Sequence, residues 1–143
     1  TLLMTIPVAS PELSFQYSGS LSRMNLSALN SFIEPGEQIR VKSGVLHEVT
    51  YEINVVSGRA TGNVRAVYRD LSLAAINKET GSQKGFFDSI SSFYANTFKI
   101  NGTNVPNKSG SMKIGEVKYT KKRSDCFYEF AWFAVRSGVA DVV

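Results

Sequence analysis

The residue types that most often perform chemistry are sparse in this sequence. His47 is the only histidine and Cys126 the only cysteine, so a metal site built from these two types would have too few ligands. Serine–histidine–aspartate catalysis would have to use His47, and nothing near it resembles the strand-to-helix turn that presents a nucleophilic serine. The pattern around His47 places it in mid-strand on an apolar face, opposite Tyr68. A packed, hydrogen-bonded side chain is favoured there over a catalyst.

Two further signals for chemistry are also weak. The stretch TGSQKG at 80–85 superficially resembles a phosphate-binding loop but lacks the Gly-x4-Gly-Lys-Ser/Thr spacing, which predicts an ordinary loop. The carboxylates that stand apart in the sequence form no pair that can be placed in one cleft; they are Asp70, Asp88, Glu116 and Glu129. The sequence therefore contains no enzyme signature, and we expect a non-enzymatic protein without a cofactor or a metal.

The clearest structural signal is a long hairpin over residues 38–77. From Ile39 to Val55 the odd positions are mostly apolar and the even positions mostly polar, which is the period-2 alternation of a half-buried strand. Ser57-Gly58 supplies the turn, so Val56 should face Arg59. This register pairs apolar with apolar positions: Ile53 with Gly62, Tyr51 with Val64, Val49 with Ala66 and His47 with Tyr68.

The length and phase of this hairpin predict a curved sheet. A strand over 38–56 would extend about 60 Å at about 3.3 Å per residue, whereas strands typically hold about 5–6 residues. At Asp70 the apolar phase slips by one position, which a β-bulge would explain and which would bend the sheet. A long, curved sheet with one apolar face suits a groove or an elongated scaffold.

Helices and shorter strands are expected around the hairpin. Strands are predicted within 11–21 and 111–122, and helices at 25–33, with Asn25 as the N-cap and Pro35 as the stop, at 84–97 and at 125–138. The last helix contains the stretch CFYEFAWFAV, begins after Ser124 and should end at Gly138. Its polar stripe is very narrow, so it either packs against the sheet or contacts lipid. We therefore expect one α+β domain over 1–143: a curved, mostly antiparallel sheet with three helices on one face.

The net charge of +4 is concentrated in one segment. Residues 113–123 carry five basic side chains and one acidic one, and the rest of the chain holds 11 of the 16 basic and 11 of the 12 acidic residues. The basic residues are Lys113, Lys118, Lys121, Lys122 and Arg123. Such a patch attracts phosphate, whether of lipid headgroups or of nucleic acid. It is equally consistent with a solvated strand end that lysines protect from edge aggregation.

Several stretches together resemble the C-terminal region of AsmA-like proteins, the bacterial cell-envelope family related to the translocation and assembly module protein TamB. They are SFQYSGSLSRMNLSALNSFIEP, IRVKSGVLHEV, ANTFKINGTNVPNKSGSMKIGEVKYTKK and FYEFAWFAVRSG. The resemblance implies an inner-membrane anchor outside this chain, a periplasmic location, and a long β-sheet whose apolar trough carries phospholipid towards the outer membrane. The chain would then be a C-terminal fragment of a longer protein, and it holds too few strands to form a conduit alone.

The leading hypothesis is a lipid-handling or structural module of the cell envelope, with phospholipid, the membrane surface or envelope proteins as partners. Acyl chains would lie on the strip Val45, Val49, Tyr51, Ile53, Val55, Val64, Ala66 and Tyr68. The five basic residues of 113–123 would contact headgroups or the membrane surface. The first alternative is that helices cover the strip as a core, which makes the chain an end-cap or interaction domain without lipid. A nucleic-acid-binding domain is less favoured, because charge outside 113–123 is balanced.

Overall fold

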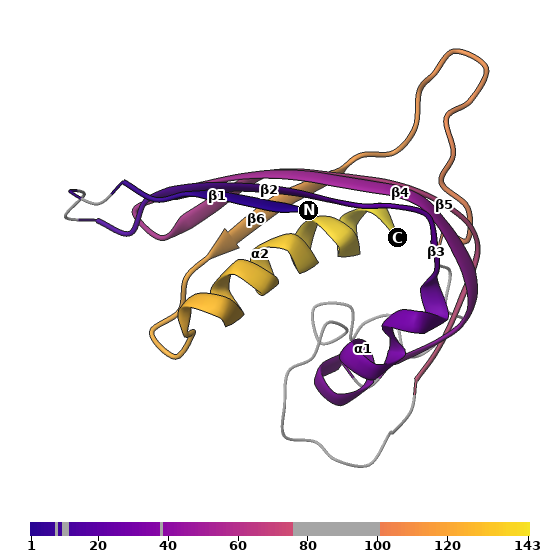
Figure 1. Cartoon of the computed structure of the whole chain (residues 1–143), viewed down its shortest axis with the longest axis horizontal. Helices are drawn as coiled ribbons and strands as arrows, with labels where there is room; N and C mark the ends of the chain where they lie inside the picture. Colours follow the sequence, from indigo (N-terminus) through magenta and orange to yellow (C-terminus); the bar gives the residue numbers. More distant parts are fainter. Residues whose placement is uncertain (8, 10–11, 38, 76–100) are drawn as a thin grey trace.

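Six antiparallel strands form one sheet that carries two α-helices, which confirms the α+β class (Figure 1). This computed structural model describes residues 1–7, 9, 12–37, 39–75 and 101–143. The strands are β1 (Leu2–Thr5), β2 (Phe15–Leu21), β3 (Met24–Asn25), β4 (Ile39–Val56), β5 (Arg59–Ala75) and β6 (Gly115–Thr120). The helical segments are the 3-10 turn η1 (Leu26–Leu29), α1 (Asn30–Glu37) and α2 (Phe127–Val142). The predicted helix at 84–97 and the TGSQKG loop lie outside the described residues.

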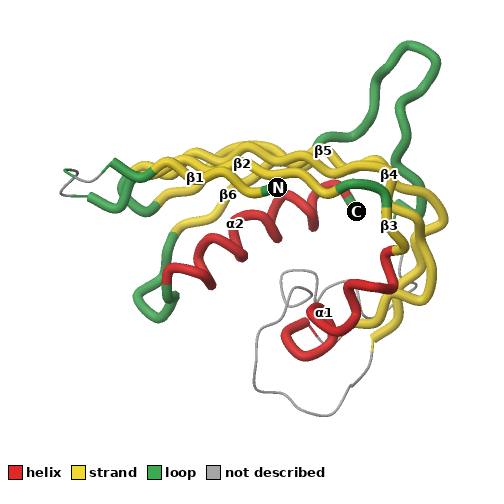
Figure 2. Tube along the Cα trace, in the orientation of Figure 1, coloured by secondary structure: helices red, strands yellow, loops and turns green. Residues whose placement is uncertain are grey.

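The long hairpin forms as predicted, with β4 and β5 at the centre of the sheet. The strand order is β1-β2-β4-β5-β6, and β3 pairs with β4 beyond the end of β2. From the Ser57-Gly58 turn to Val49 the register is the predicted one: Val56 pairs with Arg59, Ile53 with Gly62, and Val49 with Ala66. Both helices lie on the concave side of the curved sheet (Figure 2). None of the described helices is long and apolar enough to cross a bilayer.

Beyond Val49 the register departs from the prediction. A bulge at His47 shifts the pairing, so that Leu46 and not His47 pairs with Tyr68. As a result Leu46 is 3% exposed, whereas His47 points into solvent; the prediction of a packed His47 on the apolar face was wrong. The predicted bulge at Asp70 is present, and Asp70 has a φ of 56°. A third shift lies between Val41 and Ser43, and the hairpin curves strongly over this stretch (Figure 1).

The helix boundaries differ from the predicted ones. Asn25 does cap the first helical segment, because its side-chain oxygen accepts a hydrogen bond from the Ser27 amide at 3.1 Å. The α-helix that follows runs through Pro35 to Glu37, so the predicted stop was wrong. The C-terminal helix begins two residues later than expected and passes through Gly138 to Val142. Its first turn is closed by Glu129, whose carboxylate accepts from the Cys126 amide at 2.9 Å.

Helix α2 packs along the edge strand β6 and accepts hydrogen bonds from it. Two groups on α2 accept hydrogen bonds from amides of β6 that do not pair with β5: the Asp141 carboxylate from Glu116 at 2.8 Å, and the Ser137 hydroxyl from Lys118 at 3.2 Å. A Cβ at Gly138 would lie 2.6 Å from Val64, so a glycine is required for this close approach and does not mark the end of the helix.

Candidate functional site

A cavity of about 560 Å³ lies on the concave side of the sheet, between α1, α2 and the bulged part of the β4–β5 hairpin. Its size is within the range of about 300–1,000 Å³ that is typical of small-molecule sites. The described residues that line it are predominantly apolar and come from β1, β2, β4, β5, η1 and both α-helices. The cavity is therefore the leading candidate for a binding site.

Four of the eight residues of the predicted lipid-contacting strip line this cavity. They are Val49, Tyr51, Ala66 and Tyr68. Ala66 and Tyr68 belong to a small cluster of buried residues that also contains Leu46 and Val142. The predicted strip and the cavity thus coincide over one half of the hairpin.

The other residues of the strip lie elsewhere. Ile53, Val55 and Val64 are buried together with Phe130 and Ala134 of α2, in the main hydrophobic core. Val45 pairs with Arg69 on the face opposite to Leu46 and Tyr68, because successive residues of a strand point to opposite faces. The expected continuous apolar trough is therefore divided into a sealed part and a hollow part.

Aromatic packing explains why α2 seals its part of the sheet. The rings of Phe15 and Phe127 are 5.1 Å apart, and those of Tyr119 and Phe130 are 6.0 Å apart. The Tyr17 hydroxyl donates to the Ala131 carbonyl at 2.8 Å. Of the aromatic residues of CFYEFAWFAV, Phe130 is buried in the core and Phe127 packs against it, whereas Tyr128 remains in solvent.

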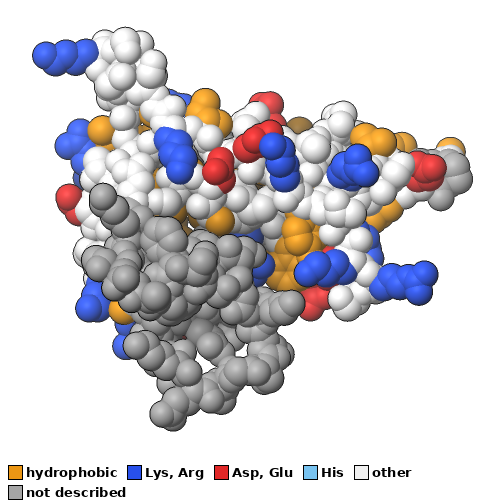
Figure 3. All heavy atoms as spheres, turned by 180° about the vertical axis from the view of Figure 1, so that it is seen from behind, with side chains coloured by type: hydrophobic (Ala, Val, Ile, Leu, Met, Phe, Trp, Pro, Cys, Tyr) orange, Lys and Arg blue, Asp and Glu red, His pale blue; other side chains and the backbone are white. Residues whose placement is uncertain are grey.

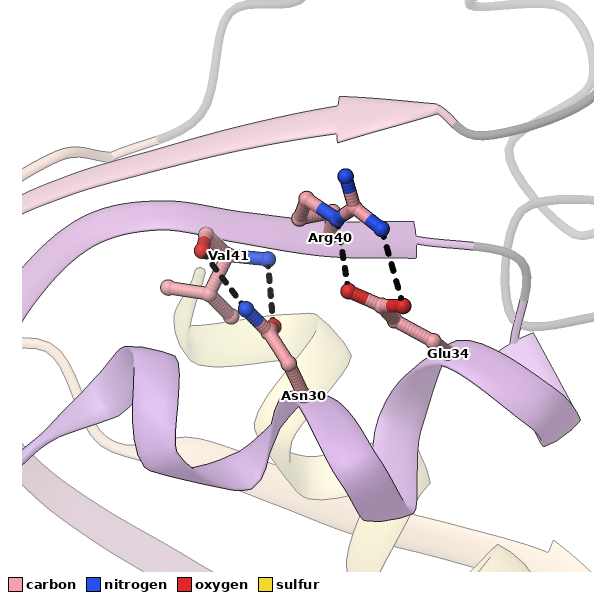
Figure 4. A network of polar contacts seen from close by, with 4 residues as sticks. All are labelled: Asn30, Glu34, Arg40 and Val41. Atoms are coloured by element: carbon pink, nitrogen blue, oxygen red, sulfur yellow. Dashed lines mark hydrogen bonds and ion pairs between the residues drawn. The ribbon is translucent and has the colours of Figure 1, made fainter.

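Helix α1 forms another wall of the cavity and is fixed to the sheet by polar contacts (Figure 4). The Asn30 amide group donates to the Val41 carbonyl at 3.0 Å and accepts from the Val41 amide at 2.8 Å. Arg40 donates to both carboxylate oxygens of Glu34, at 2.6 and 3.1 Å. This contact lowers the pKa of Glu34, because the hydrogen bonds to Arg40 favour the charged carboxylate.

A buried ion pair connects α1 to α2 at the cavity wall. Arg136 donates to both carboxylate oxygens of Glu37, at 3.0 and 3.1 Å, and the Trp132 indole nitrogen donates to the same carboxylate at 3.3 Å. The side chain of Glu37 is 7% exposed and that of Arg136 is 18% exposed. Next to them the ring of Phe32 lies edge-on to Trp132, with the ring centroids 4.9 Å apart. Sequence reasoning missed this cluster, since Glu37 and Arg136 are 99 residues apart.

The two tyrosines of the cavity differ in their hydrogen bonding. The Tyr68 hydroxyl donates to the Asn101 carbonyl at 2.7 Å, and burial raises the pKa of Tyr68 to about 12. The Tyr51 hydroxyl makes no hydrogen bond to any other described residue, and its ring lies over Gly19, where a Cβ would be 2.3 Å from the Tyr51 oxygen. Burial also raises the pKa of Tyr51, so it stays a neutral hydrogen-bond donor at physiological pH. Tyr51 therefore offers a ligand a hydrogen-bond donor that no other described residue engages.

The five basic residues of 113–123 do not form one patch. Lys121, Lys122 and Arg123 lie in the turn between β6 and α2, whereas Lys113 precedes the opposite end of β6. Lys118 is within β6 and forms an ion pair with Glu116 at 2.8 Å. Of the five predicted headgroup-contacting residues, the turn at 121–123 thus holds the three that are adjacent.

Among the described residues, no group of three or more histidine, cysteine, aspartate or glutamate side chains is placed to hold a metal. In comparisons with known proteins, no protein-family model matches the chain, no curated protein is similar to it and no solved structure matches its fold. The resemblance to AsmA-like proteins therefore stays a prediction, and the function must be argued from the site itself.

Proposed function

We propose that the chain is a non-enzymatic lipid-handling module of the bacterial cell envelope that accommodates an acyl chain in the concave cavity. The observation that carries the proposal is a cavity of about 560 Å³ whose described lining is predominantly apolar. In line with the family resemblance, the module would be periplasmic and part of a protein anchored in the inner membrane. Phospholipid or another acyl lipid would be its ligand.

The mechanism would be passive binding. An acyl chain lying along Leu46, Val49 and Ala66 would be removed from water, which contributes about 0.8 kcal/mol per buried CH₂ group. The Tyr51 hydroxyl would donate a hydrogen bond to an ester or carboxylate oxygen of the lipid. No proton transfer or covalent step is required, which agrees with the absence of an enzyme signature in the sequence.

Native mass spectrometry of the purified chain, with lipid extraction from the same sample, tests the proposal. Ala66→Phe would fill the cavity, and Val67→Phe adds the same side chain on the opposite face of the same strand, as a matched control. We expect acyl-lipid adducts on the wild type and on Val67→Phe, and their loss from Ala66→Phe. Circular dichroism and thermal unfolding of both variants check that they remain folded.

The alternative proposal is a structural end-cap or interaction domain without a lipid. It is favoured by one observation, the dense packing of α2 on half of the concave face. A wild-type mass without adducts, even after incubation with phospholipid or fatty acid, would support the end-cap and reject lipid binding. Equal adducts on wild type and Ala66→Phe would show that the lipid binds outside the cavity.

A further inference from the structure

One end of the sheet combines basic and apolar side chains. The β4–β5 turn and the turn between β6 and α2 meet there, because the Lys121 amide donates to the Gly58 carbonyl at 2.9 Å. We use the name tip surface for six residues of these turns and their flanks: Val56, Arg59, Lys121, Lys122, Arg123 and Tyr128. In the space-filling view, basic and hydrophobic side chains lie side by side toward this end of the molecule (Figure 3). The cavity lies toward the other end of the hairpin.

The apolar members of the tip surface are exposed to solvent. Tyr128 on the first turn of α2 is 82% exposed, and Val56 beside the hairpin turn is 55% exposed. Leu13, whose carbonyl accepts from the Gly58 amide, adds a further exposed side chain next to them. Val55 is buried under α2, so Val56 points to the opposite face of the sheet, whereas Tyr128 lies on the helix of the concave side. The two apolar side chains therefore flank the tip from opposite sides, and both would meet a flat surface that approaches the sheet end-on.

The acidic groups at this end are engaged by donors of the protein. Asp125 is buried and accepts from the Lys122 amide at 2.8 Å and from the Tyr119 hydroxyl at 2.9 Å. Glu129 accepts from the Cys126 amide, and Glu12 accepts from the Ser57 hydroxyl. Three cations of the tip surface, Arg59, Lys122 and Arg123, are exposed to solvent. Lys121 is half-buried, and its ammonium group donates to the Lys122 carbonyl at 3.2 Å.

We infer that the tip surface docks on an anionic membrane surface. Basic side chains are attracted to acidic headgroups, while a tyrosine and an aliphatic side chain insert into the interfacial region. A nucleic acid is less well matched, because single strands are bound by several aromatic side chains in a basic groove, and Tyr128 is the single aromatic residue among the six of the tip surface. This inference extends the proposed lipid-handling function, since it states which end of the module meets the membrane.

Vesicle co-sedimentation tests the inference with the whole chain. We expect the wild type to bind vesicles of phosphatidylcholine with phosphatidylglycerol, to bind pure phosphatidylcholine weakly, and to lose binding as salt increases. Each basic residue near an anionic surface strengthens binding about fivefold, so Lys121→Ala/Lys122→Ala/Arg123→Ala should weaken it roughly a hundredfold. The matched control Lys42→Ala/Lys108→Ala/Lys113→Ala removes the same charge from exposed positions elsewhere. It should retain binding within about threefold, as expected for a change of net charge alone.

A second pair of variants tests the apolar contribution. Val56→Ser/Tyr128→Ser removes the exposed apolar side chains of the tip surface, and we expect at least a tenfold loss of vesicle binding. Ile114→Ser/Val67→Ser changes an exposed and a half-buried apolar residue elsewhere and should have little effect on binding. Because all these residues are at least partly in solvent, the variants should fold, which circular dichroism verifies.

The outcomes separate this inference from the cavity proposal. Ala66→Phe should bind vesicles as the wild type does, even when it no longer carries a lipid adduct. Failure of the wild type to bind acidic vesicles, or an equal loss in the two triple variants, would overturn the tip surface as a docking site. Binding to oligothymidylate that exceeds binding to vesicles, and that is lost in the tip variants, would also overturn it and assign the surface to nucleic acid.

Discussion

The two halves of the concave face are built from the same alternating hairpin but end in different states. Near the Ser57-Gly58 turn, Val55 and Val64 are sealed under α2, and Phe130 fills the space between sheet and helix with no exposed surface. Beyond Val49, bulges bend the hairpin away from α2, and α1 faces the sheet across a cavity. An apolar strand face thus predicts burial, but the bends and the helices decide whether the face becomes core or binding site.

The sealed half should contribute most of the free energy of unfolding. A phenylalanine-to-alanine substitution in each half tests this, and the one in the sealed half should have the largest effect of all the variants below. Phe130→Ala should cost about 3–5 kcal/mol in the free energy of unfolding, because it opens a void in close-packed core. Phe32→Ala on α1, where the ring is 60% exposed, should cost about 1 kcal/mol or less. Urea denaturation followed by circular dichroism measures both. Similar losses in the two variants would contradict the division into a sealed and a hollow half.

Breaking the ion pair at the cavity wall should cause the second-largest loss in the free energy of unfolding. Glu37→Ala leaves the guanidinium of Arg136 largely buried without this carboxylate, and we expect a loss of about 2–4 kcal/mol. Glu34→Ala, the control on the same helix, breaks a solvent-exposed pair with Arg40 and should change stability little. Trp132 is the single tryptophan and contacts Glu37, so its fluorescence reports the change directly. Unchanged emission in Glu37→Ala would argue against this contact between the helices.

The stability of the protein should depend on whether the residue at position 70, in the bulge, can adopt a positive φ. Asp70 has a positive φ of 56°, which a β-branched side chain adopts only at a cost. Asp70→Val should therefore destabilise the protein by about 1–2 kcal/mol, whereas Asp70→Gly should be close to neutral. Arg69→Val, one residue away in extended backbone, serves as the control. Equal effects of the two valine substitutions would show that the bulge does not require a left-handed residue.

The smallest effect concerns the two tyrosines of the cavity. Tyr68→Phe should lose about 1 kcal/mol with its hydrogen bond to Asn101, whereas Tyr51→Phe should change the stability of the unliganded protein little. The raised pKa of Tyr68, about 12, also makes stability depend on alkaline pH. The contribution is complete below the unfolded pKa of about 10, and it is lost as the pH rises towards 12, because the unfolded state ionises first.

Unfolding at pH 9 and pH 11 measures this dependence. Tyr68→Phe should lose less stability between these two pH values than the wild type does. An unaltered alkaline loss in Tyr68→Phe would assign the effect to other groups, such as Tyr119, whose pKa burial and the Asp125 carboxylate raise to about 12.

The sequence predicted the hairpin because turn and alternation are local signals that agree with each other. Val49, Ile53 and Val56 therefore received their correct partners. At His47 the local pattern carried no sign of the extra residue, since Leu46 and Val45 are both apolar and either could face inward. The bulge moves Leu46 to the concave face, so this cavity residue was assigned to the wrong face; the next shift, between Ser43 and Val45, returns Val41 and Ile39 to their predicted face.

Other features depend on contacts between distant segments. In the sequence, Gly138 predicts the end of a helix. In the structure a glycine is required there because α2 approaches Val64 and Val117 too closely for a side chain. The ion pair of Glu37 with Arg136 joins helices that the sequence leaves unrelated. The apolar strip could therefore be found from the sequence, whereas its division into core and cavity required the arrangement in space.

The hydrogen bonds of Asp141 and Ser137 to the amides of β6 limit how copies of this chain could join. With these donors occupied, the flank of the sheet at β6 cannot readily accept a further strand, and β1 forms the opposite flank. Of the two flanks that the described strands form, β1 alone then stays available for the addition of a strand from another copy. If two copies paired through β1, each would occupy the other's free edge. Association along the sheet would then stop at a dimer and would not extend into a fibre.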